Sequence, residues 1–119
     1  MDLTYAEDFA AEWIAAWNSH GLERILSHYT DDFEMNSPYI VQYVGEPSGQ
    51  LVGKEKIRAY WKVGLARNPN LHFTLDAVLV GANSISIQYH NEKGSAVSEV
   101  LFFDPSGRVF RAAAHYAVL

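Results

Sequence analysis

The chain has 119 residues, of which 49% are hydrophobic and 19% charged, and its formal net charge is -5 at pH 7. This balance excludes a disordered chain, and the thinly spread lysines and arginines exclude the basic stripe that nucleic acid requires. The absence of cysteine excludes a disulfide framework and thiolate chemistry. The length is typical of one domain, so residues 1–119 are predicted to fold as a single unit.

The N-terminal segment is predicted to be a helix over residues 5–18. Thr4 and Glu7 have the spacing of a capping box, which marks a helix start. Phe9, Trp13 and Trp17 recur every fourth residue and therefore form one apolar stripe. Acidic residues interrupt this segment, unlike the uncharged core of a signal peptide, and no apolar run is long enough to span a bilayer. We therefore expect a cytoplasmic location.

Residues 22–66 are predicted to form two further helices with a short strand and a loop between them. Apolar residues at helical spacing mark a helix over residues 22–29, and Phe33 to Met35 is a strand that Pro38 ends. Three glycines and a proline indicate a loop over residues 40–53, with a few extended residues at 41–44, and this loop could form a rim or flap. The helical period returns over residues 54–66.

The C-terminal half is predicted to be an antiparallel meander. Runs rich in β-branched and aromatic residues lie near residues 71–80, 84–90, 96–103 and 108–118, and hairpin-turn sequences separate them. Helices followed by a meander indicate the α+β class. We expect a cone-shaped α+β barrel in which three N-terminal helices pack on a strongly curved antiparallel sheet and enclose an apolar cavity.

Several short stretches carry a resemblance to a known family. They are residues 13–18, 22–25, 29–34, 37–38, 53–58 and 103–109, which include Trp-Ile-Ala-Ala-Trp-Asn at 13–18 and Phe-Asp-Pro-Ser-Gly-Arg-Val at 103–109. In these stretches the chain resembles the nuclear transport factor 2-like superfamily, and within it the SnoaL-like group of polyketide cyclases and ketosteroid isomerases. The resemblance covers nearly the whole chain and implies the cone fold.

The resemblance also assigns roles to three positions. Ser37 stands where ketosteroid isomerases have a general-base Asp, and its hydroxyl is too weak an acid to shuttle a proton alone. Trp13 stands where those enzymes have an oxyanion-stabilising Tyr, and it can donate one N–H. Glu99 stands where they have a protonated acid that donates to the substrate oxygen. The resemblance therefore implies that Glu99 is the acidic group of the site.

Periodicity leaves the orientation of Glu99 open. If Glu99 faces inward with Val97 and Leu101, desolvation raises its pKa and makes it a candidate general acid or hydrogen-bond donor. The opposite register turns Ser98 and Val100 inward and leaves Glu99 in water. The run from residue 100 to residue 103 is apolar on both faces, so the pattern favours neither arrangement strongly.

The last strand has a similar ambiguity. Counting from Gly107 directs Phe110, Ala112, Ala114 and Tyr116 inward and directs Arg111, Ala113 and His115 outward. Ala112 and Ala114 occupy the positions where SnoaL-like cyclases carry a catalytic acid and sometimes a histidine. A β-bulge would bring His115 inside, where it could act as a base.

We expect the cavity to bind a small apolar ligand, such as a carbonyl compound, without a cofactor. The histidines have none of the spacings typical of a metal site, so no metal is predicted. If the protein is an enzyme, its reaction is expected to be a proton transfer in an isomerase, cyclase or dehydratase. The candidate catalytic residues are Glu99, Tyr116 and His115. The candidate ligand-binding residues are Trp13, Trp17, Ser37, Tyr39, Trp61 and Leu101.

The expected partners are this ligand and a second copy of the chain, with neither nucleic acid nor membrane. Val100 and Phe102 would make the outer sheet face too apolar for water, which suggests a homodimer through the sheets, as the resemblance also implies. The alternative is a non-catalytic dimerisation or partner-binding module whose cone is filled by its own side chains.

Overall fold

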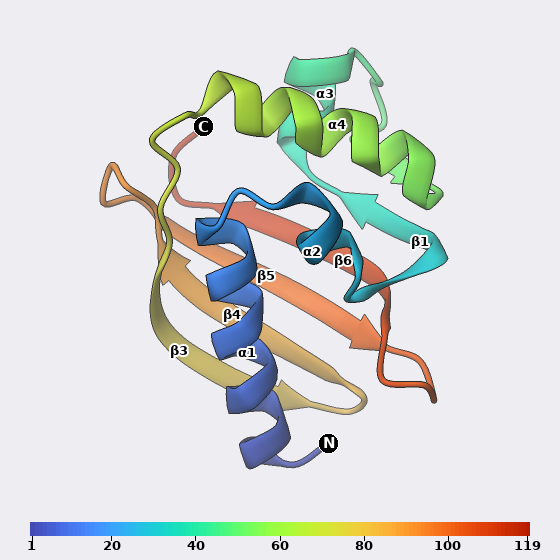
Figure 1. The fold of residues 1–119 in the computed structure, drawn as a ribbon, viewed down its shortest axis with the longest axis vertical. Coiled ribbons are helices and arrows are strands. Elements are labelled where there is room, and N and C mark those ends of the chain that lie inside the picture. Colours follow the sequence, from blue (N-terminus) through green and yellow to red (C-terminus); the bar gives the residue numbers. More distant parts are fainter.

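A computed structural model describes all residues from Met1 to Leu119 and contains four helices and six strands (Figure 1). In chain order these are α1 (Leu3–Asn18), α2 (Leu22–Leu26), β1 (Tyr29–Asn36), α3 (Pro38–Val44), β2 (Gln50–Val52), α4 (Lys54–Arg67), β3 (Thr74–Gly81), β4 (Ser84–His90), β5 (Ala96–Phe103) and β6 (Val109–Tyr116). No helix has both the length and the apolarity that a bilayer span requires.

The strands form one curved, unclosed sheet in the order β2-β1-β6-β5-β4-β3. Strands β3 to β6 are the predicted antiparallel meander, whereas β1 joins its edge in parallel to β6. In Figure 1, α1 crosses β3, β4 and β5, and α4 lies over β1 with α3 beside it. The predicted α+β fold is therefore confirmed, with one more helix and one more strand than the sequence indicated.

The start of α1 differs from the prediction. The helix begins at Leu3, and the Asp2 side chain caps it by accepting a hydrogen bond from the Tyr5 amide at 2.8 Å. Thr4 already lies inside the first turn, so the predicted capping box between Thr4 and Glu7 is wrong. A carboxylate and a hydroxyl both suit an N-cap, and here the residue two positions earlier takes that place.

The segment predicted as a loop contains the helix α3. Ser37 is its N-cap and accepts a hydrogen bond from the Tyr39 amide at 3.2 Å, Pro38 occupies the first turn, and Gly45 ends the helix with a φ of 73°. The prediction of extended residues at 41–44 is therefore wrong. After this helix, β2 pairs with β1, which extends the sheet beyond the predicted meander.

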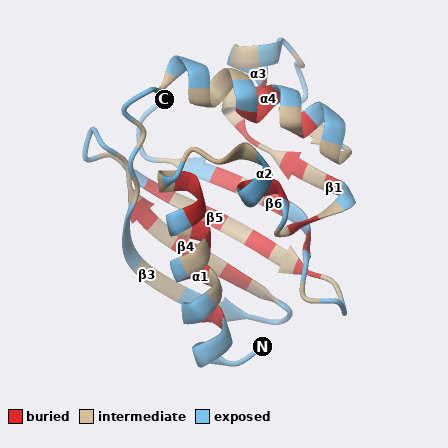
Figure 2. Ribbon diagram, viewed as in Figure 1, coloured by how far each residue is buried: buried red, intermediate tan, exposed pale blue.

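The core lies between α1, α4 and the inner face of the sheet, where Figure 2 shows the buried residues concentrated. Along β4 and β5 every second residue is buried, and in β5 these residues are Val97, Glu99, Leu101 and Phe103. Of the two arrangements that the sequence allowed for β5, the structure has the one in which Glu99 faces inward.

A β-bulge changes the start of β6. Phe102 pairs with Arg111 while Phe103 pairs with Val109, so Phe110 has no partner on β5. The predicted inward position of Phe110 is therefore wrong, because the side chain is 43% exposed and Val109 is buried instead. The bulge precedes residue 112, so Ala112 and Ala114 still face inward.

Candidate functional site

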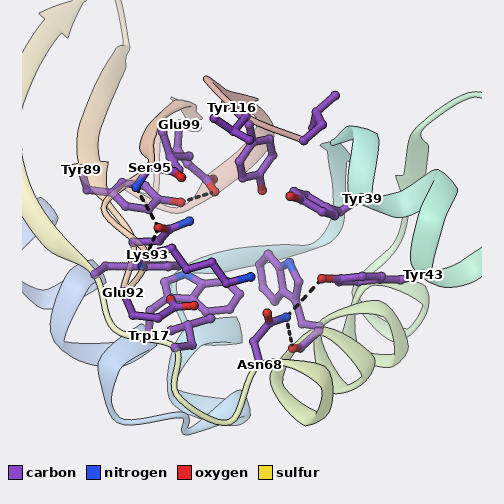
Figure 3. A pocket seen from close by; sticks show the side chains of 18 of the residues that line it. Trp17, Tyr39, Tyr43, Asn68, Tyr89, Glu92, Lys93, Ser95, Glu99 and Tyr116 are labelled. Atoms are coloured by element: carbon purple, nitrogen blue, oxygen red, sulfur yellow. Dashed lines mark hydrogen bonds between the residues drawn. The ribbon is translucent and has the colours of Figure 1, made fainter.

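A cavity of about 250 Å³ lies among α1, α4, the end of β4, the start of β5 and the end of β6. Aromatic residues are the largest group in its wall, and Figure 3 shows most of the side chains that line it. The aromatic lining residues are Trp17, Tyr39, Tyr43, Tyr60, Trp61, Phe73, Tyr89 and Tyr116. Exposed Glu92 and Lys93, from the turn between β4 and β5, also line the cavity. The cavity therefore combines a deep aromatic part with a charged rim.

Glu99 is the buried carboxyl group of this cavity. It is 5% exposed, and its Oε1 accepts a hydrogen bond from the Tyr89 hydroxyl at 3.2 Å. Burial raises the pKa of Glu99 from 4.5 to about 7, against the opposing effect of the Tyr89 hydrogen bond. Near neutral pH the side chain is therefore present both as an acid and as a base, which suits proton transfer in either direction.

Tyrosine hydroxyls surround Glu99. Figure 3 shows the hydroxyls of Tyr39 and Tyr116 directed toward the same part of the cavity as the Glu99 carboxyl. The Tyr39 and Tyr116 rings meet edge to face with centroids 4.8 Å apart, which fixes their relative orientation. Burial raises the pKa of Tyr116, with a further contribution from the Glu99 charge, so its phenol stays protonated and can donate a hydrogen bond.

Two tryptophans of α1 differ in their hydrogen bonds. Trp13 Nε1 donates to the Tyr29 hydroxyl at 2.9 Å, whereas the buried Trp17 Nε1 has no partner. Trp17 lines the cavity and packs edge to face on Trp61 with centroids 5.1 Å apart. Trp17, one helical turn after Trp13, is therefore the α1 tryptophan whose N–H has no partner within the protein.

The structure brings five of the nine candidate residues together around the cavity: Glu99, Tyr116, Trp17, Tyr39 and Trp61. Three others are buried but do not line it. Trp13 is bonded to Tyr29, Leu101 lies deeper in the core, and Ser37 caps α3 and accepts a hydrogen bond from the Tyr60 hydroxyl at 3.2 Å.

His115 does not enter the cavity. It pairs with Ser98 and lies exposed on the opposite face of the sheet from Glu99 and Ala114. The bulge that could have turned it inward is present, but it lies at Phe110, and the strand alternates regularly afterwards. The expectation that His115 could act as a base inside the cavity is therefore wrong.

Sequence reasoning missed several residues of the wall, among them Tyr43, Tyr89 and Asn68. Tyr43 lies on the unpredicted helix α3, and Asn68 Nδ2 donates to its hydroxyl at 3.1 Å. Tyr89 alternates with the buried Ile85 and Ile87 on β4, so this alternation was the signal that could have placed it inside. No group of three or more His, Cys, Asp or Glu side chains is arranged to hold a metal ion.

Comparisons with known proteins agree with this architecture. The model of the SnoaL-like domain family matches residues 10–118. A SnoaL-like protein of unknown function from Burkholderia thailandensis E264 is 52% identical with a TM-score of 0.93, over 98% of this chain and 97% of that chain. No curated protein matches the chain.

More distant solved structures share the fold. A suggested isomerase of the SnoaL-like family from Agrobacterium tumefaciens C58 is 17% identical with a TM-score of 0.76, over 96% of this chain and 98% of that chain. A protein with a cystatin-like fold from Methylobium petroleophilum PM1 is 16% identical with a TM-score of 0.74, over 100% and 80% of the two chains. Because the family model matches nearly the whole chain, the chain belongs to the SnoaL-like domain family.

Proposed function

We propose that the protein binds a small, apolar, carbonyl-bearing compound in the cavity and that Glu99 transfers a proton to and from it without a cofactor. The single observation that supports this proposal is a buried carboxyl group with a pKa near 7 in an aromatic cavity. The description of the Agrobacterium protein as a suggested isomerase agrees with this chemistry. At 17% identity, however, the similarity to that protein supports only a shared fold.

The proposed step is an enolisation. The ionised Glu99 carboxylate removes a proton from the carbon next to the carbonyl, and the electron pair of the C–H bond forms the carbon–carbon double bond of an enolate. The Tyr116 hydroxyl donates a hydrogen bond to the oxygen on which the negative charge develops. Glu99 then returns the proton to the same carbon, giving exchange, or to another carbon of the conjugated system, giving an isomer.

Hydrogen exchange of a simple ketone tests this step. The acetyl methyl protons of 4′-isopropylacetophenone should be replaced by deuterium in D2O faster with the protein than without it, as followed by proton NMR. Glu99→Gln keeps the shape but cannot accept the proton, so the catalysed rate should fall on the order of 10²-fold or more. Glu7→Gln makes the same change on the exposed surface of α1, outside the cavity lining, and should leave the rate nearly unaltered.

If the wild type and the Glu99→Gln protein exchange the methyl protons at the same rate, Glu99 is not the base and the proposal fails. The non-catalytic alternative, a module for dimerisation or partner binding, would then be favoured.

The cytoplasmic location stays a prediction from the sequence.

We also propose that two copies pair through the outer face of the sheet. Phe102 and Phe110 lie on this face with ring centroids 6.5 Å apart, and the Arg111 guanidinium lies 5.6 Å from the Phe102 ring centre. Arg111 also pairs with Glu34 at 3.2 Å, so the patch carries both charges beside its apolar part. A patch of this mixed kind suits the self-complementary contact of a twofold dimer.

Light scattering during size exclusion tests the pairing. The wild type should have twice the mass of the chain, and Phe102→Glu should reduce it to one chain, because a buried charge would face its own copy across the twofold axis. Ala59→Glu, on the exposed surface of α4, is the matched control and should remain a dimer. A wild type with the mass of one chain at high concentration would refute the pairing.

A further inference from the structure

The indole N–H of Trp17 is a buried donor that the folded chain leaves unsatisfied. The side chain is 8% exposed, and no protein atom accepts a hydrogen bond from Nε1. Among the buried side-chain nitrogens and oxygens of this protein it is the only one without a partner. Native structures contain few such groups, because leaving a buried donor unpaired costs more than a hydrogen bond contributes on average.

The position of Trp17 links this donor to the cavity. Trp17 is part of the lining, and Figure 3 shows it on one side of the cavity with Glu99 and Tyr116 on the other. Trp13, one turn earlier on the same helix, has its N–H satisfied by Tyr29. The unsatisfied donor is therefore found only where α1 meets the cavity.

The size and chemistry of the wall restrict the molecule that fits between these groups. A cavity of about 250 Å³ is smaller than the roughly 300–1,000 Å³ typical of sites for drug-sized ligands, so it suits a compound of one or two rings. Aromatic side chains on most sides favour a flat ring. Polar groups lie on two opposite walls, with Glu99 and Tyr116 on one and the Trp17 N–H on the other. Of the other polar lining groups, the Tyr43 hydroxyl already accepts a hydrogen bond from Asn68.

We propose that Trp17 Nε1 is a ligand-binding donor and that the ligand is a small ring compound with a hydrogen-bond acceptor at each of two opposite ends. One acceptor is the carbonyl oxygen at Tyr116, so this inference rests on the proposed function. The second acceptor bonds to Trp17. Solvent does not reach this nitrogen in the structure, so the proposal requires a neighbouring side chain to move aside when the second acceptor binds. The Trp61 and Phe73 rings pack on Trp17 and are the aromatic neighbours closest to hand on the cavity side.

Two probe compounds of nearly the same shape isolate the second acceptor. 1,4-Diacetylbenzene has an acetyl group at each end of its ring, whereas 4′-isopropylacetophenone has an isopropyl group in place of one of them. The wild type should bind the first more tightly by roughly tenfold, as expected for one additional hydrogen bond to a buried donor. Trp17→Phe keeps a ring but lacks the N–H, so it should bind both probes with equal affinity.

The indole N–H resonances give a second readout that needs no variant to bind ligand. The chain has three tryptophans and therefore three such resonances, and Trp17→Phe identifies the one from Trp17. On addition of 1,4-diacetylbenzene to the wild type, the Trp17 proton should move downfield, as an N–H does when it acquires an acceptor. The Trp13 proton keeps its acceptor, the Tyr29 hydroxyl, so it should move much less than the Trp17 proton and serves as the internal control.

The outcomes separate this inference from the proposed function. Equal affinity of the wild type for both probes, with an unmoved Trp17 resonance, overturns the role of Trp17 but leaves proton transfer by Glu99 intact. An equal loss of affinity for both probes in Trp17→Phe overturns it as well, because the ring then acts through packing alone. Failure of both probes to bind at millimolar concentration overturns this inference and the proposed function together.

Discussion

Replacing Glu99 with Gln should stabilise the protein at alkaline pH and leave its stability at acidic pH almost unchanged. The pKa of Glu99 rises from 4.5 to about 7 on folding, because burial disfavours the charged form. The folded protein therefore retains this proton at pH values where the unfolded chain has lost it. It follows that the wild-type free energy of unfolding falls as pH rises from 4.5 through about 7 and then levels off.

The size of this effect follows from the pKa difference. At about 1.4 kcal/mol for each pH unit between the unfolded and folded pKa, the total loss is about 3 kcal/mol. Gln has the same shape and no charge to desolvate, so Glu99→Gln escapes the loss. The variant should thus match the wild type near pH 4.5 and exceed it by about 3 kcal/mol above pH 8.

Urea unfolding of both proteins at several pH values from about 5 to about 8 measures the difference. Subtracting the two curves cancels the contributions of all other carboxyl groups, which are identical in the two chains. Glu92→Gln, exposed at the rim, is the control and should follow the wild type at every pH. If the Glu99→Gln and wild-type curves run parallel across the range, Glu99 titrates normally in the folded state and the reasoning is refuted.

Three further substitutions probe the wall and its supports. Gly64→Ala should raise the free energy of unfolding, measured by urea denaturation, by about 0.5–1 kcal/mol, because Gly64 lies inside α4. The added Cβ meets Tyr43 Cε2 at an ordinary contact distance of 3.6 Å, so a destabilised variant would contradict this prediction. Ser37→Ala should lower the free energy of unfolding by about 1 kcal/mol through loss of the α3 cap, and unchanged hydrogen exchange of the α3 amides would argue against the cap. Tyr89→Phe should raise the pKa of Glu99 further, because the hydroxyl favours the carboxylate; a carbon NMR titration that shows a lower pKa would disprove this.

The sequence predicted the meander well because each of its strands carries its own local signal. The turns at residues 81–83, 91–94 and 104–107 separate the strands, and the structure places all four within a few residues of their predicted bounds. By contrast, α3 has only seven residues, and a Ser-Pro pair such as Ser37-Pro38 marks the end of a strand as well as the start of a helix. The parallel pairing of β1 with β6 joins residues about 80 positions apart, and no local pattern records such a contact.

The cavity residues were harder to predict than the fold. Trp13 and Trp17 belong to the same helical stripe, so periodicity places both on the buried face of α1 without saying which one reaches the cavity. That distinction depends on Tyr29, which comes from another element and satisfies Trp13. Similarly, the run from residue 100 to residue 103 is apolar on both faces, so it does not indicate which way Glu99 points. The orientation of Glu99 is fixed by its pairing with Ile87 and Ala114 on the neighbouring strands.

The absence of a charged partner determines what Glu99 can do. A cation within a few ångströms would favour the carboxylate and lower its pKa, as Arg24 does for Glu12 on the surface. The deep wall holds neutral phenols and indoles, and the one cationic lining residue, Lys93, is exposed at the rim. Desolvation therefore prevails over Coulombic stabilisation. A ligand that fills the cavity removes still more water from Glu99, so binding of a neutral ketone should raise the pKa of Glu99 further and make its carboxylate a stronger base in the complex than in the free protein.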